Sequence, residues 1–293
     1  MKKKLFAIAL MTMVALTIFA GCGSDDTKSS ATFDDSKEIT VISREDGSGT
    51  RTAFIELVGV EVKNADGTKK DMTTEEAVIA KATDVMMTTV ANDNYAIGYI
   101  SLGSLNDTVK AAQVDGVDAT PENVKNGSYV IQRPFHIVTK GTPNNLAQDF
   151  IDFILSSDGQ AVVSNGYIAV DDSTPAYSGS KPSGTLVIAG SSSVTPIMEK
   201  LKEAYLAVNK NAKVEIQQSD SSAGITGTID GTCDIGMVSR DLKPEELKEV
   251  DPTQIAIDGI AIVINKNNPT NSLSKDQIKG IYTGENLTWS ELN

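Results

Sequence analysis

The chain has 293 residues, enough for two domains that each bury a hydrophobic core. Its net charge of −13 argues against nucleic acid or an anionic lipid surface as a partner. With a single histidine (His136) and two cysteines (Cys22 and Cys233), the sequence offers no zinc ligand set and no histidine-dependent nucleophile. We expect no metal and no cofactor, and we interpret His136, in an apolar run, as a core or hinge residue.

The first 21 residues have the form of an export signal. Three lysines precede an apolar run, Leu5 to Ala20, which is short for a membrane span of roughly 20 residues. The run ends in a sequence similar to the lipobox of bacterial lipoproteins, with Phe19 where that motif usually has leucine. This similarity implies that residues 1–21 are a signal peptide and that Cys22 carries the lipid anchor (palmitate among its acyl chains). Polar residues 22–37 are expected to form a flexible tether.

These features predict a protein held by lipid on the extracytoplasmic face of the cell membrane. Removal of residues 1–21 would leave 23 basic and 39 acidic side chains, a net charge of −16. Any anion site in the mature protein must therefore act through local donors against an unfavourable overall field.

A strand, a glycine-rich turn and a helix start follow one another near the beginning of the mature chain. Ile39–Ser43 is the expected strand, and Thr52–Val58 the expected helix. Between them, Arg44-Glu-Asp-Gly-Ser-Gly-Thr-Arg51 combines an arginine with hydroxyl groups and two glycines. Unpaired N–H groups and the helix dipole make such a helix start suitable for an anion. An ordinary strand-to-helix turn with a surface arginine is the alternative.

The middle of the chain alternates strands and helices. Thr73–Glu76 has the form of a capping box and predicts a helix that continues to Ala82. A strand is expected at 95–101 and an extended crossing segment at 129–140. Short helices are expected at 121–127, 146–155 and 160–163, and a linker rich in Ser, Pro and Gly at 171–183.

The strand-and-loop pattern then starts again. The expected strands 185–189, 214–218 and 233–238 end in small or hydroxyl-bearing loops, namely Gly190–Ser193, Asp220–Gly224 and Ser239-Arg240. Strands that alternate with helices are typical of open α/β sheets, whose ligands lie beyond the carboxyl ends of the strands. Several such loops together indicate a site for an oxyanion.

These loops resemble those of the phosphate-binding lipoproteins of bacterial ABC phosphate importers. The resemblance also includes Gly98–Leu102, Asp258–Asn265 and Gly284–Ser290, and it covers nearly all of the mature chain. It implies a two-lobed α/β fold of the periplasmic-binding-protein (type II) class with two hinge strands. Usual members begin with the segment that matches Gly184–Ser193, so this chain resembles a circular permutation in which residues 171–183 join the former termini.

The resemblance also implies how the lobes are assembled. Lobe A would be residues 132–257, including the linker 171–183, and lobe B would be split into 38–131 and 258–293. The hinges would lie near Arg133-Pro134 and Ile257–Gly259. A monomer is expected.

The family's phosphate contacts correspond to residues on both lobes. Lobe A would supply Ser193, the backbone of Val194, Ser221 and Ser239, and lobe B would supply Arg44, Ser48, Gly49 and Thr50. Asp46 corresponds to an acid that holds the arginine. Ser239 is a departure, because many members have there an aspartate that accepts the proton of phosphate.

The sequence therefore predicts a binding protein, not an enzyme, that captures inorganic phosphate and delivers it to the permease of an ABC importer. One alternative is a binding protein for another oxyanion, such as sulfate or molybdate. Another is an exported phosphatase, which would need a metal cluster or a nucleophile–base pair that the sequence does not offer. A third is an adhesion or sensing module on the cell surface.

Overall fold

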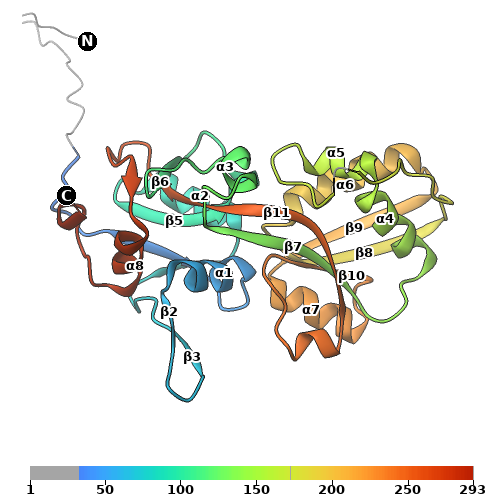
Figure 1. Ribbon diagram of the computed structural model, residues 1–293, viewed down its shortest axis with the longest axis horizontal. Coiled ribbons are helices and arrows are strands. Elements are labelled where there is room, and N and C mark those ends of the chain that lie inside the picture. The colour runs from blue at the N-terminus through green and yellow to red at the C-terminus, as the bar shows by residue number, and fades with distance from the viewer. Residues whose placement is uncertain (1–32, 172, 293) are drawn as a thin grey trace, which may run out of the picture. The chain divides into compact units, whose positions relative to one another are not determined.

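The computed structural model describes residues 33–171 and 173–292 (Figure 1). The predicted signal peptide, Cys22 and most of the tether lie outside the described residues. Within the described residues, no helix is both long and apolar enough to cross a bilayer. The helices are α1 Gly49–Val58, α2 Thr83–Asn92, α3 Pro121–Lys125, α4 Asn145–Leu155, α5 Ser157–Val163, α6 Thr195–Val208, α7 Ser221–Asp230 and α8 Lys275–Thr283, with short 3-10 helices at Leu102–Ser104, Glu246–Lys248 and Trp289–Leu292.

The strands form one long twisted path in the order β4-β1-β5-β11-β7-β10-β8-β9. Strand β6 pairs with β11 and β12 pairs with β6, while β2 and β3 form a separate pair. Strand β1 runs parallel to β4 and β5, and β8 runs parallel to β9 and β10, whereas β11 is antiparallel to β5 and β7. Their bounds are β1 Thr40–Arg44, β2 Glu61–Lys63, β3 Lys69–Asp71, β4 Val78–Ala80, β5 Ala96–Ser101, β6 Lys110–Val114, β7 Gln132–Thr139, β8 Gly184–Ser191, β9 Ala212–Ser219, β10 Ile235–Val238, β11 Asp251–Ile264 and β12 Ser272–Leu273.

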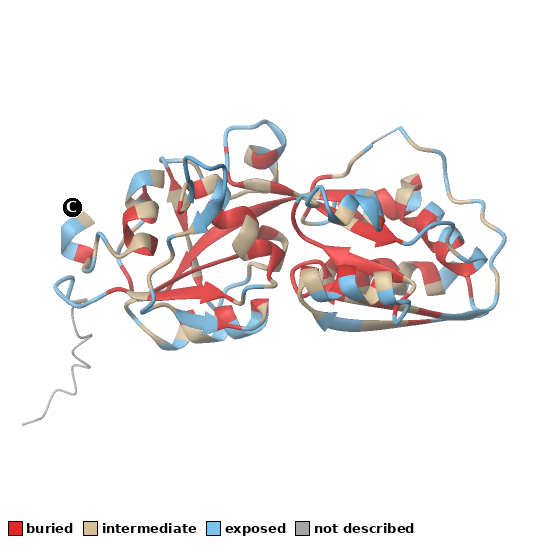
Figure 2. Ribbon diagram, turned by 90° about the horizontal axis from the view of Figure 1, so that it is seen from below, coloured by how far each residue is buried: buried red, intermediate tan, exposed pale blue. Residues whose placement is uncertain are grey.

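Buried apolar side chains gather into two main clusters. One surrounds β1, β5, α1 and the second part of β11, and it includes Phe54, Tyr99 and Tyr282. The other surrounds β8, α4 and α6, and it includes Phe150 and Tyr205. A small third cluster packs α7 against β10 and β7. We name the two parts of the molecule after their central strands, the β5 half and the β8 half; Figure 2 shows the buried strands of each in red.

Strands β7 and β11 connect the halves. On β11, Ile255 and Ala256 belong to the cluster of the β8 half, and Ile260 to that of the β5 half. The two strands pair over Asp251–Gly259 and Gln132–Thr139 and lie side by side in Figure 1. Among the described residues, β7 and β11 are the two segments by which the chain passes between the halves. The segment near Ile168 adds an isolated antiparallel bridge to Ile257 on β11.

Most predicted elements are present, and one is wrong. The strands expected at 39–43, 95–101, 185–189, 214–218 and 233–238 correspond to β1, β5, β8, β9 and β10, and the helices expected at 121–127, 146–155 and 160–163 to α3, α4 and α5. The capping-box helix from Thr73 to Ala82 does not form. Instead the Thr73 N–H and hydroxyl both donate to Asp71 Oδ1, at 2.8 and 2.6 Å, and Val78–Ala80 pairs with β1. The Asx turn at Asp71 and the pairing of Val78–Ala80 with the edge of β1 are therefore more favourable here than the helix that the capping pattern predicted.

The linker expected at 171–183 is held by one buried carboxylate. Asp149 on α4 accepts hydrogen bonds from the hydroxyls of Tyr177 (2.5 Å) and Tyr205 (2.7 Å) and from the Ser180 N–H (2.8 Å). Burial alone would raise the pKa of Asp149. The hydrogen bonds together outweigh this effect, so the pKa of Asp149 is lowered. The part of the linker around Tyr177 and Ser180 is therefore anchored to the β8 half.

Candidate functional site

Helices α1, α2, α6 and α7 begin at one place in the molecule. The Thr50 hydroxyl, in the first turn of α1, lies 2.8 Å from the Ser193 hydroxyl, just before α6. The Thr83 hydroxyl, at the start of α2, lies 3.2 Å from the same Ser193 oxygen. Each helix start carries N–H groups without an intrahelical partner and a partial positive charge. Their convergence makes a region suited to an anion.

Arg44 lies at the centre of this region and is 1% exposed. It is the last residue of β1, and its backbone N–H donates to the Tyr99 hydroxyl at 3.1 Å. Its guanidinium donates to the Ala80 carbonyl at 3.0 Å and, across to the β8 half, to the Ser192 hydroxyl at 3.0 Å. Burial raises the pKa of Tyr99 to about 12, so this hydroxyl stays neutral beside the arginine. The arginine is a fixed, buried cation among hydroxyl groups.

A second set of hydroxyls lies on the β8 half. Ser191 Oγ donates to Ser239 Oγ at 2.9 Å, and Ser221 Oγ lies 3.3 Å from the same oxygen. Ser221 Oγ also accepts from the Ser239 N–H at 3.1 Å. All three serines are buried. The ends of β8 and β10 and the start of α7 thus form one hydroxyl-rich wall.

The two glycines of the first loop let the β5 half approach this wall. The Gly47 carbonyl accepts from the Ser222 N–H at 3.2 Å, and a methyl group on Gly47 would overlap the Asp220 carboxylate. A methyl group on Gly49 would overlap the Ser221 hydroxyl and lie 2.7 Å from Ser239 Oγ. Glycine is required here by the close approach of the other half.

Most of the predicted site residues therefore meet. Arg44, Gly49 and Thr50 of the β5 half face Ser193, Ser221 and Ser239 of the β8 half. The Ser48 hydroxyl caps α1 by accepting from the Arg51 N–H at 3.3 Å. The Val194 N–H donates to the Ser191 carbonyl at 3.0 Å, and its side chain lies in the hydrophobic cluster. The backbone of Val194 is thus engaged within its own loop.

The predicted role of Asp46 as the partner of Arg44 is wrong. Asp46 is 98% exposed at its side chain and pairs with Arg51 at 2.8 Å. Glu45 holds Arg44 instead, with Oε2 2.8 Å from Nε and Oε1 2.7 Å from Nη2. This is a bidentate pair, the strongest arrangement for a guanidinium and a carboxylate. Asp46 follows the strand at the turn, where its side chain points to solvent, whereas Glu45 has the reach to fold back over Arg44.

Sequence reasoning missed three further polar contacts. Ser192 receives the Arg44 hydrogen bond, and its place beside Ser193 in the Gly190–Ser193 loop was a usable signal. Thr83 begins α2, a helix that the sequence did not predict. Arg133 donates from β7 to the Ser239 carbonyl at 3.0 Å. Its position at the predicted hinge gave no indication of contact with the serines.

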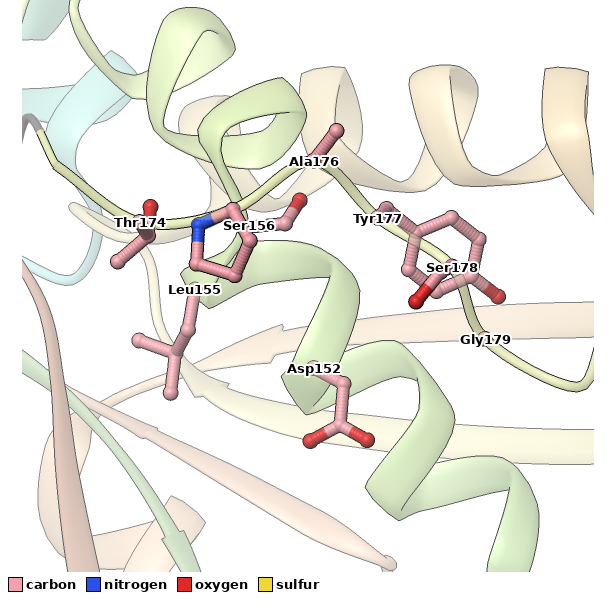
Figure 3. A pocket seen from close by; sticks show the side chains of 9 residues that line it. Asp152, Leu155, Ser156, Thr174, Ala176, Tyr177, Ser178 and Gly179 are labelled. Atoms are coloured by element: carbon pink, nitrogen blue, oxygen red, sulfur yellow. The ribbon is translucent and has the colours of Figure 1, made fainter.

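Among the described residues, neither a metal cluster nor the pocket beside the linker competes with this site. No group of three or more His, Cys, Asp or Glu side chains among them could hold a metal ion. A pocket of about 380 Å³ lies between the linker Thr174–Gly179 and the end of α4 (Figure 3). It is lined by Asp152, Leu155 and Ser156 and contains none of the predicted oxyanion residues. It is a hollow left where the linker crosses α4.

Comparison with known proteins gives a consistent result. The model of the PBP superfamily domain matches residues 25–158 and 175–293. The chain is 54% identical to phosphate-binding protein PstS 2 of Streptococcus agalactiae serotype V, over 99% of this chain and 98% of the relative. It is 43% identical to PstS 2 of Streptococcus pneumoniae serotype 4, over 99% of both chains.

A solved structure is similar along the same range. The crystal structure of a phosphate-binding protein of a phosphate ABC transporter from Streptococcus pneumoniae TIGR4 matches with a TM-score of 0.69 and 45% identity. The match covers 87% of this chain and all of that one. The fold is the type II periplasmic-binding-protein fold that the sequence predicted. The chain belongs to the PBP superfamily and, within it, to the family of PstS phosphate-binding proteins.

Proposed function

We propose that this protein captures inorganic phosphate between the β5 and β8 halves and delivers it to the membrane permease of an ABC importer. The observation that supports this most is the buried meeting of Arg44 with hydroxyls from both halves, at the starts of α1, α2, α6 and α7. Phosphate carries several acceptor oxygens and a negative charge, which is what such a set of donors stabilises.

The proposed contacts are Arg44, Ser48, Gly49 and Thr50 from one half and Ser193, Ser221 and Ser239 from the other, with Ser192 added. Each hydrogen bond to a charged oxygen is worth about 1.5–3 kcal/mol net. Micromolar affinity needs about 8 kcal/mol. This set therefore suffices even after the cost of ordering the two halves around the anion.

The direct test is calorimetric titration of the purified protein with inorganic phosphate, followed by sulfate and molybdate. We expect one anion per chain, with phosphate bound at micromolar or lower Kd. Tighter binding of sulfate or molybdate would favour the alternative oxyanion function. Turnover of a phosphomonoester by the same preparation would favour the phosphatase function, and binding of none of these anions would leave the adhesion or sensing function.

The halves also support the proposed lobe assignment, with lobe B made of 38–131 and 258–293 and lobe A of 132–257. The ends of the described chain lie side by side, since the Ile39 N–H donates to the Leu287 carbonyl at 2.7 Å and Ser290 N–H to the Asp35 carbonyl at 2.8 Å. Joined termini at this place would form an ordinary surface loop. The streptococcal relatives match end to end, so they share this order.

The circular permutation can be tested by reordering the chain. A variant that begins at Gly184, continues to Asn293, and passes through a short linker into Phe33–Val170 should fold and bind phosphate within about threefold of wild type, because cuts and joins in surface segments are tolerated. Because Tyr177 and Ser180 of the linker donate to the buried Asp149, a second variant keeps residues 171–183 at its new carboxyl end. Failure of both variants to fold would contradict the permutation.

The lipid anchor rests on Cys22 and the sequence before it. Cys22→Ala should abolish lipid attachment, so the protein would remain unprocessed or appear in the medium. A variant that is processed and membrane-bound like wild type would exclude the anchor while leaving the phosphate site unaffected.

A further inference from the structure

We propose that Arg133 and Asp258 are a positioning pair for the bound anion. They form an ion pair on the two connecting strands, and this pair fixes the position of the Ser239 backbone relative to the β5 half. This inference rests on the proposed phosphate-binding function. Neither residue is among the proposed anion contacts.

The pair lies where the chain passes between the halves. Arg133 on β7 and Asp258 on β11 face each other in the strand register. Ile131, just before β7, belongs to the hydrophobic cluster of the β5 half, and Phe135, on β7, to that of the β8 half. Both side chains of the pair are 1% exposed. The pair therefore lies where the chain passes from one half to the other.

Asp258 is attached to the β5 half. Its Oδ2 accepts from Arg133 Nε and Nη2 at 3.2 and 3.1 Å. Its Oδ1 accepts from the Ser101 hydroxyl at 2.9 Å and from the Gly103 N–H at 3.4 Å. Ser101 ends β5, and Gly103 lies in the 3-10 helix that follows. Both carboxylate oxygens are thereby used.

Arg133 is attached to the β8 half, through the site itself. Its Nη1 donates to the Ser239 carbonyl at 3.0 Å. The Ser239 N–H donates to Ser221 Oγ, and Ser239 Oγ accepts from Ser191. A continuous chain of hydrogen bonds thus runs from Ser101 through Asp258 and Arg133 to the serine wall. Through these hydrogen bonds, the position of Ser239 depends on how the two halves are placed relative to each other.

The charges of the pair also bear on the site. Burial lowers the pKa of Arg133, and repulsion by Arg44 is among the smaller causes, which places the two guanidinium groups within electrostatic reach. Asp258 opposes this effect by keeping Arg133 charged. A buried ion pair adds little to stability by itself, because desolvation offsets the attraction. Its place on the two strands that connect the halves is better explained by geometry than by stability.

If Asp258 positions the site, phosphate affinity should depend on whether its carboxyl is ionised. A merely structural role would not give this pH dependence. Burial raises its pKa to about 6, against the opposing effects of Arg133, Ser101 and the Gly103 N–H. Tyr129, before β7, and Tyr167, after α5, also interact with Asp258. Burial raises the pKa of both hydroxyls, so they remain neutral at physiological pH. Arg133 is the charged group that faces Asp258 among the described residues.

The test compares phosphate affinity in wild type and Asp258→Asn between pH 5 and 8. Asparagine retains an oxygen for Ser101 and removes the charge. At each pH, wild type and variant are titrated with the same protonation states of phosphate. The ratio of their Kd values therefore reports only the effect of the substitution at Asp258. We expect the variant to bind at least about tenfold more weakly at pH 7.5. The ratio should fall toward one below about pH 6, where wild-type Asp258 takes up a proton.

A Kd ratio within twofold at pH 7.5, or a ratio that does not change with pH, would overturn the inference. Absence of phosphate binding by wild type would instead overturn the proposed function. The control is Asp149→Asn, which removes a buried carboxylate on α4 whose hydrogen bonds come from Tyr177, Ser180 and Tyr205. It should lower the melting temperature and leave the affinity and its pH profile unchanged.

If Asp258→Asn does not fold, Arg133→Lys serves as the second variant. Lysine keeps a positive charge beside Asp258, but its single nitrogen cannot bridge Asp258 and the Ser239 carbonyl as the guanidinium does. Phosphate binding at least about threefold weaker than wild type in a folded protein would support the inference. Affinity within twofold of wild type would overturn it.

Discussion

The hydroxyl oxygens of Thr50 and Ser193 lie 2.8 Å apart, although 143 positions separate the two residues in the sequence. Thr50 belongs to the β5 half and Ser193 to the β8 half. Their contact exists only because the halves meet at the starts of α1 and α6. The candidate anion site is therefore built from both halves together.

Arg44→Ala should weaken phosphate binding by at least about 2 kcal/mol, roughly thirtyfold, because a buried anion would lose its fixed cation. The other nearby cations, Arg51, Arg133 and Arg240, are engaged by Asp46, Asp258 and Glu246. Calorimetry at low and moderate salt measures the effect. Lys63→Ala is the control, since it removes one positive charge from the exposed strand β2. A loss for Arg44→Ala below tenfold, or one that Lys63→Ala reproduces, would place Arg44 outside the site.

Glu45→Gln should destabilise the phosphate-free protein by about 1–3 kcal/mol, because it leaves the buried Arg44 without its bidentate partner. Asp46→Asn should change stability by less than about 0.5 kcal/mol, since Asp46 is exposed and its ion pair is screened. Urea unfolding measures both. Saturating phosphate should reduce the difference, because the anion itself then neutralises Arg44. Equal effects of the two variants would restore Asp46 as a partner of Arg44.

Gly49→Ala should weaken phosphate binding at least about tenfold with little change in melting temperature of the phosphate-free protein. The added methyl group meets Ser221 and Ser239 only when the halves are together. Gly227→Ala is the control, because it adds a methyl group within α7, where the nearest atoms are 3.1 and 3.2 Å away. Unchanged binding in Gly49→Ala would mean that phosphate is bound without this close approach.

Ser239→Asp should sharpen the preference for phosphate over sulfate by about 1–3 kcal/mol, on the scale of one unmatched buried polar group. Near neutral pH phosphate has a proton to donate and sulfate has none, so an ionised acceptor favours phosphate and repels sulfate. In wild type, the serine hydroxyl can rotate and accept or donate. Sulfate competition against bound phosphate measures the preference. Wild type that ignores a thousandfold excess of sulfate, with no change in the variant, would show that another group rejects sulfate.

The fold and the loop residues could be predicted from sequence because their signals are local. Alternation of strands and helices, glycine-punctuated turns and hydroxyl-rich strand ends are all read within a few residues. These positions are at or next to a strand end or a helix start, and the sheet then brings them together: Arg44, Thr50, Ser193, Ser221 and Ser239.

What could not be predicted depends on neighbours that are distant in the sequence. The segment 73–82 has a good capping pattern, but Val78–Ala80 pairs with the edge of β1, and the Thr73 N–H donates to Asp71. Asp46 and Glu45 are adjacent and chemically similar, so only the fold decides which one reaches Arg44. The hydrogen bond from Arg133 to Ser239 spans 106 positions and has no motif.

The most direct measurement of the central claim is a crystal structure of the protein grown with saturating phosphate. We expect one anion between the halves, within hydrogen-bond distance of the Arg44 guanidinium and of hydroxyls from both Thr50 and Ser193, with Ser221 and Ser239 on its far side. A phosphate bound to one half alone would contradict the account, as would halves that meet through Thr50 and Ser193 while the anion lies elsewhere.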